Sequence, residues 1–118
     1  MRFVALWTTI AALLAGPAFA EGFQRVDDRN GFLSLVKDRE LKRLGVRLRV
    51  LNDGRIAGRA FGQDVTGAWD WKGGYFCRDL AVDGDPLEYN CQLVQVNGRT
   101  VRFTSDKGSG IYADLRLQ

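Results

Sequence analysis

The chain has 118 residues, of which 46% are hydrophobic, with 17 Lys and Arg against 14 Asp and Glu and no His. The absence of imidazole excludes Ser-His-Asp and Cys-His nucleophile systems and histidine acid/base catalysis. A formal charge of +3 is smaller than nucleic-acid-binding domains normally carry, so no nucleic-acid partner is expected.

The first twenty residues have the pattern of a cleaved signal peptide. Arg2 gives a positive start, residues 3–14 are almost entirely apolar, and Ala18-Phe19-Ala20 fits the small-x-small cleavage pattern. The apolar run is too short to anchor in a bilayer, and no Cys lies at the cleavage point to take a lipid. We therefore expect one soluble domain of residues 21–118, located in the periplasm or secreted.

A short helix is expected at the start of this domain. Apolar residues recur at helical spacing between Asp27 and Lys37, while Asp27 and Asp28 can cap the N-terminus and Gly31 weakens the helix. The apolar positions are Phe32, Leu33, Leu35 and Val36.

After Leu41 the apolar residues alternate, which indicates strands. Residues 46–50 and 55–61 flank a turn signal at Asn52-Asp53-Gly54 and predict a hairpin. A three-residue loop keeps the apolar residues on one face. It pairs Val50 with Ile56, Leu48 with Gly58 and Val46 with Ala60.

A third strand is expected after a turn over residues 61–64. This turn pairs Ala60 with Val65 and Ile56 with Trp69, and it places Asp70 opposite Arg55 on the outer face. The inner side of the third strand is then formed by Val65, Gly67, Trp69 and Trp71.

The remaining chain adds further short strands. Lys72-Gly73-Gly74 turns into a strand that carries Tyr75, Cys77 and Asp79, residues 82–86 read as a loop, and a fifth strand runs from Tyr89 to Val96. Cys91 and Leu93 lie on one face of that strand and Val94 and Val96 on the other, so either a bulge intervenes or both faces are covered.

Asn97-Gly98 signals another hairpin, leading into residues 100–104. The final half-buried strand carries Ile111, Ala113, Leu115 and Leu117. Together these elements predict a mainly β fold: a small antiparallel barrel or sandwich-like meander of about seven strands with one N-terminal helix.

Cys77 and Cys91 are the only cysteines. Export would bring them into an oxidising compartment, where they are expected to form a disulfide. Their spacing is not C-x-x-C, and the absence of His removes the commonest partner for a zinc or copper site, so a redox or metal role is disfavoured.

Trp69, Trp71 and Tyr75 are candidate ligand-lining residues, because aromatic rings combine large apolar area with polar groups. The alternative is that they pack over the disulfide, which we favour because small barrels are usually filled by their own side chains.

Arg47, Arg49, Arg55 and Arg59 are expected to lie together on the outer face of the first hairpin, with Arg47 opposite Arg59. They are candidates for contact with an anionic partner, lipid head group or glycan. A solvated face partly neutralised by Asp70 is the interpretation we favour, because exposed charges cost little once screened.

Asp83, Asp85 and Glu88 form an acidic loop cluster, but the spacing does not match an EF-hand. We therefore expect no metal site, and no carboxylate has a second catalytic group at recognisable spacing. No catalytic residue and no cofactor are predicted.

Several short motifs give a resemblance to known proteins. The segments Gly67 to Trp71, Gly74 to Arg78, Tyr89 to Cys91 and Phe103 to Gly108 resemble those of small exported alphaproteobacterial proteins of unknown function, across the whole mature chain. Members of that group are often labelled dihydrodipicolinate reductase, a label that the residues here do not support, because a Gly-rich strand-to-helix turn and alternating β/α pattern are missing. The chain is also loosely similar to lipocalin-like domains of unknown function.

The sequence thus favours a periplasmic or secreted binding or interaction domain with an unknown envelope protein or small ligand as partner. One alternative is a carrier of a small apolar ligand in an aromatic-lined barrel cavity. Another is a hydrolase or inhibitor acting on cell-envelope glycans. A ligand-sized cavity would favour the carrier, and an exposed aromatic or carboxylate cleft would favour the third interpretation.

Overall fold

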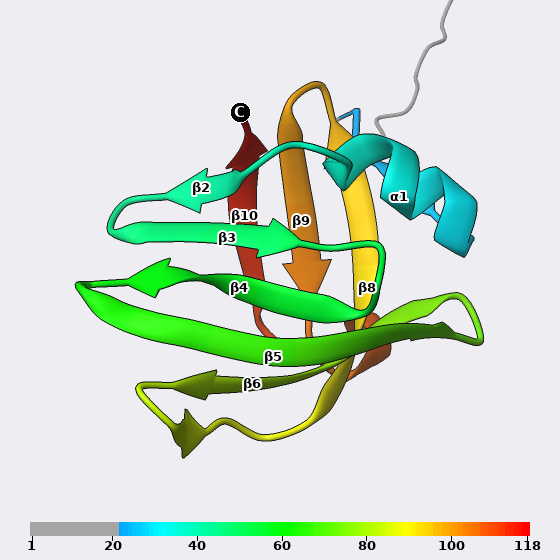
Figure 1. The fold of residues 1–118 in the computed structure, drawn as a ribbon. Helices are drawn as coiled ribbons and strands as arrows, with labels where there is room; N and C mark the ends of the chain where they lie inside the picture. Colours follow the sequence, from blue (N-terminus) through cyan, green and yellow to red (C-terminus); the bar gives the residue numbers. More distant parts are fainter. Residues whose placement is uncertain (1–21) are drawn as a thin grey trace, which may run out of the picture.

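A computed structural model describes residues 22–118, and the predicted signal peptide lies outside these residues. Figure 1 shows strands around a common interior with one helix at the side. The elements are β1 (Gln24–Val26), α1 (Arg29–Val36), β2 (Leu41–Arg43), β3 (Val46–Val50), β4 (Arg55–Ala60), β5 (Gln63–Lys72), β6 (Tyr75–Val82), β7 (Asp85–Pro86), β8 (Asn90–Asn97), β9 (Thr100–Thr104), a 3₁₀ turn (Asp106–Gly108) and β10 (Tyr112–Leu117).

Eight of the strands close into an antiparallel barrel, in the order β8, β9, β10, β2, β3, β4, β5 and β6. Closure depends on β8, which pairs with β9 along one edge and with β6 along the other. The short strands β1 and β7 are added to β8 and β6 outside this ring. The predicted small antiparallel barrel with one helix is confirmed.

The predicted register of the first hairpin is confirmed. Val50 pairs with Ile56, Leu48 with Gly58 and Val46 with Ala60, across the loop that contains Asn52, Asp53 and Gly54. The turn signal at Asn52-Asp53-Gly54 and the burial of one apolar face together determine this pairing.

The predicted turn between β4 and β5 is wrong. Phe61 and Gly62 alone form the turn, with φ angles of 52° and 80°, so Ala60 pairs with Gln63. This two-residue turn has the positive φ angles of a type I′ hairpin. It moves the register by two residues, so that Arg55 lies opposite Ala68 rather than Asp70.

Both faces of β8 are covered, which settles the alternative left open by the sequence. Its pairing with β9 runs without interruption from Leu93 to Asn97. Val94 points into the core and is fully buried, while Leu93 lies against Gly108 of the 3₁₀ turn on the other face.

The predicted disulfide is confirmed and lies where the barrel closes. Cys77 of β6 is directly opposite Cys91 of β8, with their Cα atoms 3.9 Å apart. The bond therefore links covalently the two strands whose pairing converts an open sheet into a barrel.

Helix α1 covers one side of the barrel and fills part of its interior. Asp28 caps the helix by accepting a hydrogen bond from the Gly31 N–H at 2.7 Å. Phe32, the first apolar residue after the cap, is fully buried. Its ring centroid lies 5.0 to 6.3 Å from four other aromatic rings, those of Trp69, Trp71, Phe76 and Phe103.

Two inward positions carry glycine because neighbouring strands approach closely there. A Cβ at Gly58 would collide with the carbonyl oxygen of Arg47, and one at Gly67 with that of Asp79. Gly58 lies opposite Val65 and Gly67 opposite Ile56, so the inner faces of β4 and β5 lack side chains at two diagonally neighbouring positions.

Removing the disulfide should lower the thermal stability strongly. The bond closes a 14-residue separation, and constraining such a loop in the unfolded chain contributes about 3 kcal/mol. Because Tm changes by roughly 4–8 °C per kcal/mol in a domain of this size, the Cys77→Ala/Cys91→Ala variant should melt more than about 10 °C lower. Circular dichroism melting measures this. Equal melting temperatures would contradict the stabilising role.

Truncating Phe32 should be among the most destabilising single changes. Phe32→Ala leaves a cavity inside an aromatic cluster and should cost about 3–5 kcal/mol in the free energy of unfolding. Asn30→Ala on the exposed side of the same helix should cost less than about 0.5 kcal/mol. Urea unfolding compares them, and similar costs would show that Phe32 does not hold the helix on the barrel.

Candidate functional site

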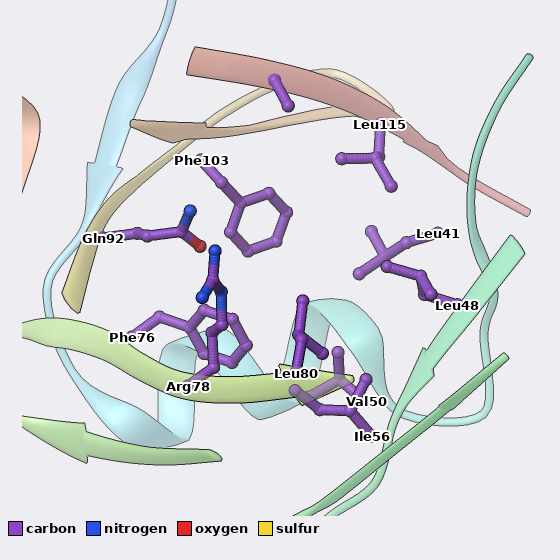
Figure 2. Close-up of a pocket in the computed structure, with 11 residues that line it drawn as sticks. Leu41, Leu48, Val50, Ile56, Phe76, Arg78, Leu80, Gln92, Phe103 and Leu115 are labelled. Carbon is purple, nitrogen blue, oxygen red and sulfur yellow. The ribbon is translucent and has the colours of Figure 1, made fainter. Parts of the chain in front are cut away.

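The barrel interior contains a cavity of about 180 Å³ that is partly open to solvent (Figure 2). Its wall is almost entirely apolar. The lining residues are Leu41, Leu48, Val50, Ile56, Phe76, Arg78, Leu80, Gln92, Phe103, Ala113 and Leu115.

The cavity is the part of the interior that Phe32 does not fill. Phe76 and Phe103 contact Phe32 and also line the cavity, so they separate the helix from the open space. The side-chain-free positions Gly58 and Gly67 lie on the adjacent strands, beside the lining residues Leu48 and Leu80. The interior is therefore packed near the helix and hollow farther along the barrel.

Arg78 and Gln92 are the polar side chains of this apolar wall. Strand alternation places Arg78 on the inner face of β6, between Phe76 and Leu80. Figure 2 shows its guanidinium extending into the space between Phe76 and Phe103, toward the amide of Gln92. A cation and an amide therefore converge on a largely hydrophobic cavity.

Burial lowers the pKa of Arg78. Loss of hydration lowers the pKa of its guanidinium below the ordinary value, and the neighbouring Asp79 carboxylate opposes this change. Nη1 donates a hydrogen bond of 2.6 Å to the Glu88 carbonyl, while Gln92 Nε2 donates a longer one of 3.4 Å to the Ser105 hydroxyl. The cation is thus partly desolvated, and its bonded partner is a neutral carbonyl.

The aromatic residues singled out from the sequence lie elsewhere. Trp69 and Trp71 pack against Phe32, and their indole N–H groups donate to the carbonyls of Leu51 at 2.7 Å and Asp27 at 3.4 Å. The Tyr75 ring lies beneath the Arg25 guanidinium, 4.9 Å from its centroid. None of the three aromatic residues lines the cavity.

Sequence reasoning missed Arg78 and Gln92. The available signal was the alternation of Phe76, Arg78 and Leu80 along β6, which puts a charged residue between two inward apolar ones. On β8 the same alternation places Gln92 on the inner face with Val94.

The four predicted anion-binding arginines do share the outer face of the β3–β4 hairpin. Arg47 is directly opposite Arg59, and all four are exposed. Three have acidic neighbours: Arg49 lies 3.9 Å from Glu40, Arg55 2.8 Å from Asp53 and Arg59 2.5 Å from Asp64. Arg47 has no ion pair within residues 22–118. Hydrogen bonds from Arg55 lower the pKa of the Asp53 carboxyl below its ordinary value.

In the acidic cluster of Asp83, Asp85 and Glu88, Asp83 is hydrogen-bonded to the start of β5. Its carboxylate accepts hydrogen bonds from the Asp64 N–H at 2.9 Å and the Gln63 side-chain amide at 3.3 Å. No group of three His, Cys, Asp or Glu side chains in the described part of the chain is placed to hold a metal ion. The helices of that same part include none long and apolar enough to cross a membrane.

Comparison with known proteins gives no match: no family model, curated protein or solved structure is similar to this chain. The resemblance to small exported proteins stays a prediction, and the cavity and the surface of the barrel are the features that bear on function.

Proposed function

We propose that this protein is a binding domain that holds a small apolar molecule with one anionic group, such as a carboxylate, inside the barrel. The observation that carries the proposal is the partly buried Arg78 guanidinium beside Gln92 in an otherwise apolar cavity. This develops the carrier alternative suggested by the sequence, with a different set of lining residues.

The cavity volume limits the size of the ligand. An engineered apolar cavity of about 150 Å³ in another protein takes up benzene, whereas sites for drug-sized ligands occupy about 300–1,000 Å³. A space of about 180 Å³ therefore suits a single ring or a short alkyl chain.

Arg78 supplies the chemical selectivity. Arginine presents a planar set of donors that matches a carboxylate, and bonds between ionised partners are about twice as strong as neutral ones. Since hydration of this guanidinium is already reduced, a bound carboxylate would replace a neutral partner with a charge-compensating one. Gln92 can add a donor from the opposite strand.

The location proposed for this binding is the periplasm or the extracellular space. The support is the pattern of the first twenty residues together with the Cys77–Cys91 bond, which is compatible with an oxidising compartment. In that compartment, a small domain without a predicted catalytic group would bind its ligand without converting it.

The proposal is tested with two probes of matched shape, benzoate and benzyl alcohol, titrated into isotopically labelled protein and followed by NMR. We expect saturable shifts at residues around the cavity, with benzoate bound at least about tenfold more tightly, because a hydrogen bond to a charged group contributes roughly 1.5–3 kcal/mol. Arg78→Met should remove this preference while leaving binding of benzyl alcohol. Arg49→Met, on the outer face, should retain it.

Two outcomes would contradict the proposal. One is that neither probe shifts the signals of cavity residues. The other is that Arg78→Met, shown to be folded by its melting curve, still prefers benzoate.

A further inference from the structure

Two large apolar side chains stand exposed on neighbouring hairpin tips. Leu44, in the β2–β3 turn, is 93% exposed, and Phe61, in the β4–β5 turn, is 74% exposed. The Phe61 N–H donates a 2.7 Å hydrogen bond to the Gly45 carbonyl, and the Phe61 ring occupies the space where a Cβ of Gly45 would be. Figure 1 shows the two turns side by side, away from α1. Leu44 and Phe61 thus form one apolar tip.

Turn formation does not require phenylalanine at position 61. Its φ of 52° lies in the left-handed region, which Gly, Asn and Asp adopt at less cost than a bulky residue. The turn therefore holds an exposed aromatic ring on a strained backbone, with the ring lying over Gly45.

A row of four cations crosses the outer face behind this tip. Arg116 of β10 lies directly opposite Lys42 of β2, Lys42 opposite Arg47 of β3, and Arg47 opposite Arg59 of β4. Neighbouring strands are about 4.8 Å apart, so the row extends over roughly 14 Å. Like charges in directly opposite positions are mildly destabilising, so this row is not explained by the stability of the sheet.

The basic side chains and the apolar tip meet at one shallow groove. Lys42, Arg43, Arg47 and Arg59 line it together with the turn glycines Gly45 and Gly62. Arg59 also bonds Asp64 and the Gly62 carbonyl, which orients its guanidinium along the turn. Glu40 lies 3.9 Å from Lys42 and Asp64 pairs with Arg59, whereas Arg43 and Arg47 have no ion pair within residues 22–118. The groove therefore keeps a net positive charge, and it borders directly on the turns that carry Leu44 and Phe61.

We propose that this tip docks the protein on an anionic phospholipid surface, with Leu44 and Phe61 entering the bilayer interface and the groove receiving lipid phosphates. Binding here does not involve Arg78 or Gln92 and is independent of the ligand proposed for the cavity.

The order of groups along the two hairpins favours a bilayer over an acidic protein. Lys42 precedes Leu44 by two residues, and Arg59 precedes Phe61 by two, so at about 3.3 Å per residue the cations lie roughly 7 Å behind the apolar tip. A bilayer has the same order of layers, because its acyl chains lie beneath the lipid phosphates. Apolar side chains of proteins that bind at the membrane interface enter it by about 5–10 Å, which matches the distance between the tip and the cations. Two isolated protruding side chains need no shaped partner in a fluid surface.

The experiment measures flotation of the full mature chain with vesicles of equal parts phosphatidylcholine and phosphatidylglycerol, against vesicles of phosphatidylcholine alone. We expect binding to the anionic vesicles only, weakened by high salt. Lys42→Gln/Arg47→Gln should bind about 30-fold more weakly, since each basic residue near an anionic surface contributes about 1 kcal/mol. This variant relieves like-charge contacts, so its fold should be retained.

Leu44→Ser/Phe61→Asn tests the apolar part, with an expected loss of at least about tenfold in vesicle binding. The Asn-Gly pair it creates is well suited to a type I′ turn, which keeps the hairpin intact. The matched controls are Ile111→Ser, at a residue 84% exposed on another loop, and Lys37→Gln after the helix. Both controls should bind vesicles as the unchanged protein does.

The proposal is overturned if the unchanged protein does not distinguish the two vesicles, or if either double variant binds as well as it does. Equal weakening by Lys37→Gln would show a diffuse charge effect, equal weakening by Ile111→Ser would show that the apolar contribution is not confined to the tip, and either result would overturn the proposal too. Soluble polyglutamate tests the alternative of an acidic protein partner. The surface would be assigned to an acidic polypeptide if the unchanged protein bound polyglutamate but not vesicles, and if the Leu44→Ser/Phe61→Asn variant still bound polyglutamate.

Discussion

The pairing of β6 with β8 is the constraint on which the rest of the structure depends. It consists of three residue pairs, Phe76 with Gln92, Cys77 with Cys91 and Arg78 with Asn90. Without these pairs the strands would form an open sheet with two exposed edges, which is prone to pairing with other chains. The disulfide occupies the middle pair and holds this short contact in register.

The same short contact also builds the candidate site. Because side chains alternate along each strand, the disulfide points outward while Phe76, Arg78 and Gln92 point into the barrel. Arg78 and Gln92 come from strands that meet only at this seam. The relative position of the cation and the amide therefore depends on the barrel remaining closed, so the disulfide that stabilises the fold also holds the candidate site together.

The fold could be predicted from the sequence where one face had to be buried. The β3–β4 register followed from the turn signal at residues 52–54 together with placing Val46, Leu48 and Val50 on one side, since a shift of one residue would have exposed all three. The β4–β5 register could not be fixed this way, because a shift of two residues keeps every side chain on its face. Only the turn distinguished the two registers, and phenylalanine at a positive φ gives no turn signal.

The candidate sites were harder to predict because they depend on contacts between distant segments. Trp69 and Trp71 look like ligand-binding residues in isolation, but Phe32, more than thirty positions earlier in the chain, packs against both rings. Strand β2 is only three residues long, too short for an alternation pattern, so nothing in the sequence aligns Lys42 with Arg47 or with Arg116.

The molecule has two sets of charged side chains that do not stabilise the barrel, Arg78 inside it and the row of cations on its outer face. Inside, one guanidinium is partly desolvated in an apolar cavity. Outside, four cations stand in a row, of which Lys42 and Arg59 have an acidic neighbour and Arg47 and Arg116 have none within residues 22–118. Each feature opposes folding, by loss of hydration or by like-charge contact. A domain of this size has little stability to spare, and the covalent link at the β6–β8 seam offsets such costs by limiting the freedom of the unfolded chain. The disulfide is therefore the feature that allows a small barrel to keep both an incompletely filled interior and a crowded basic face.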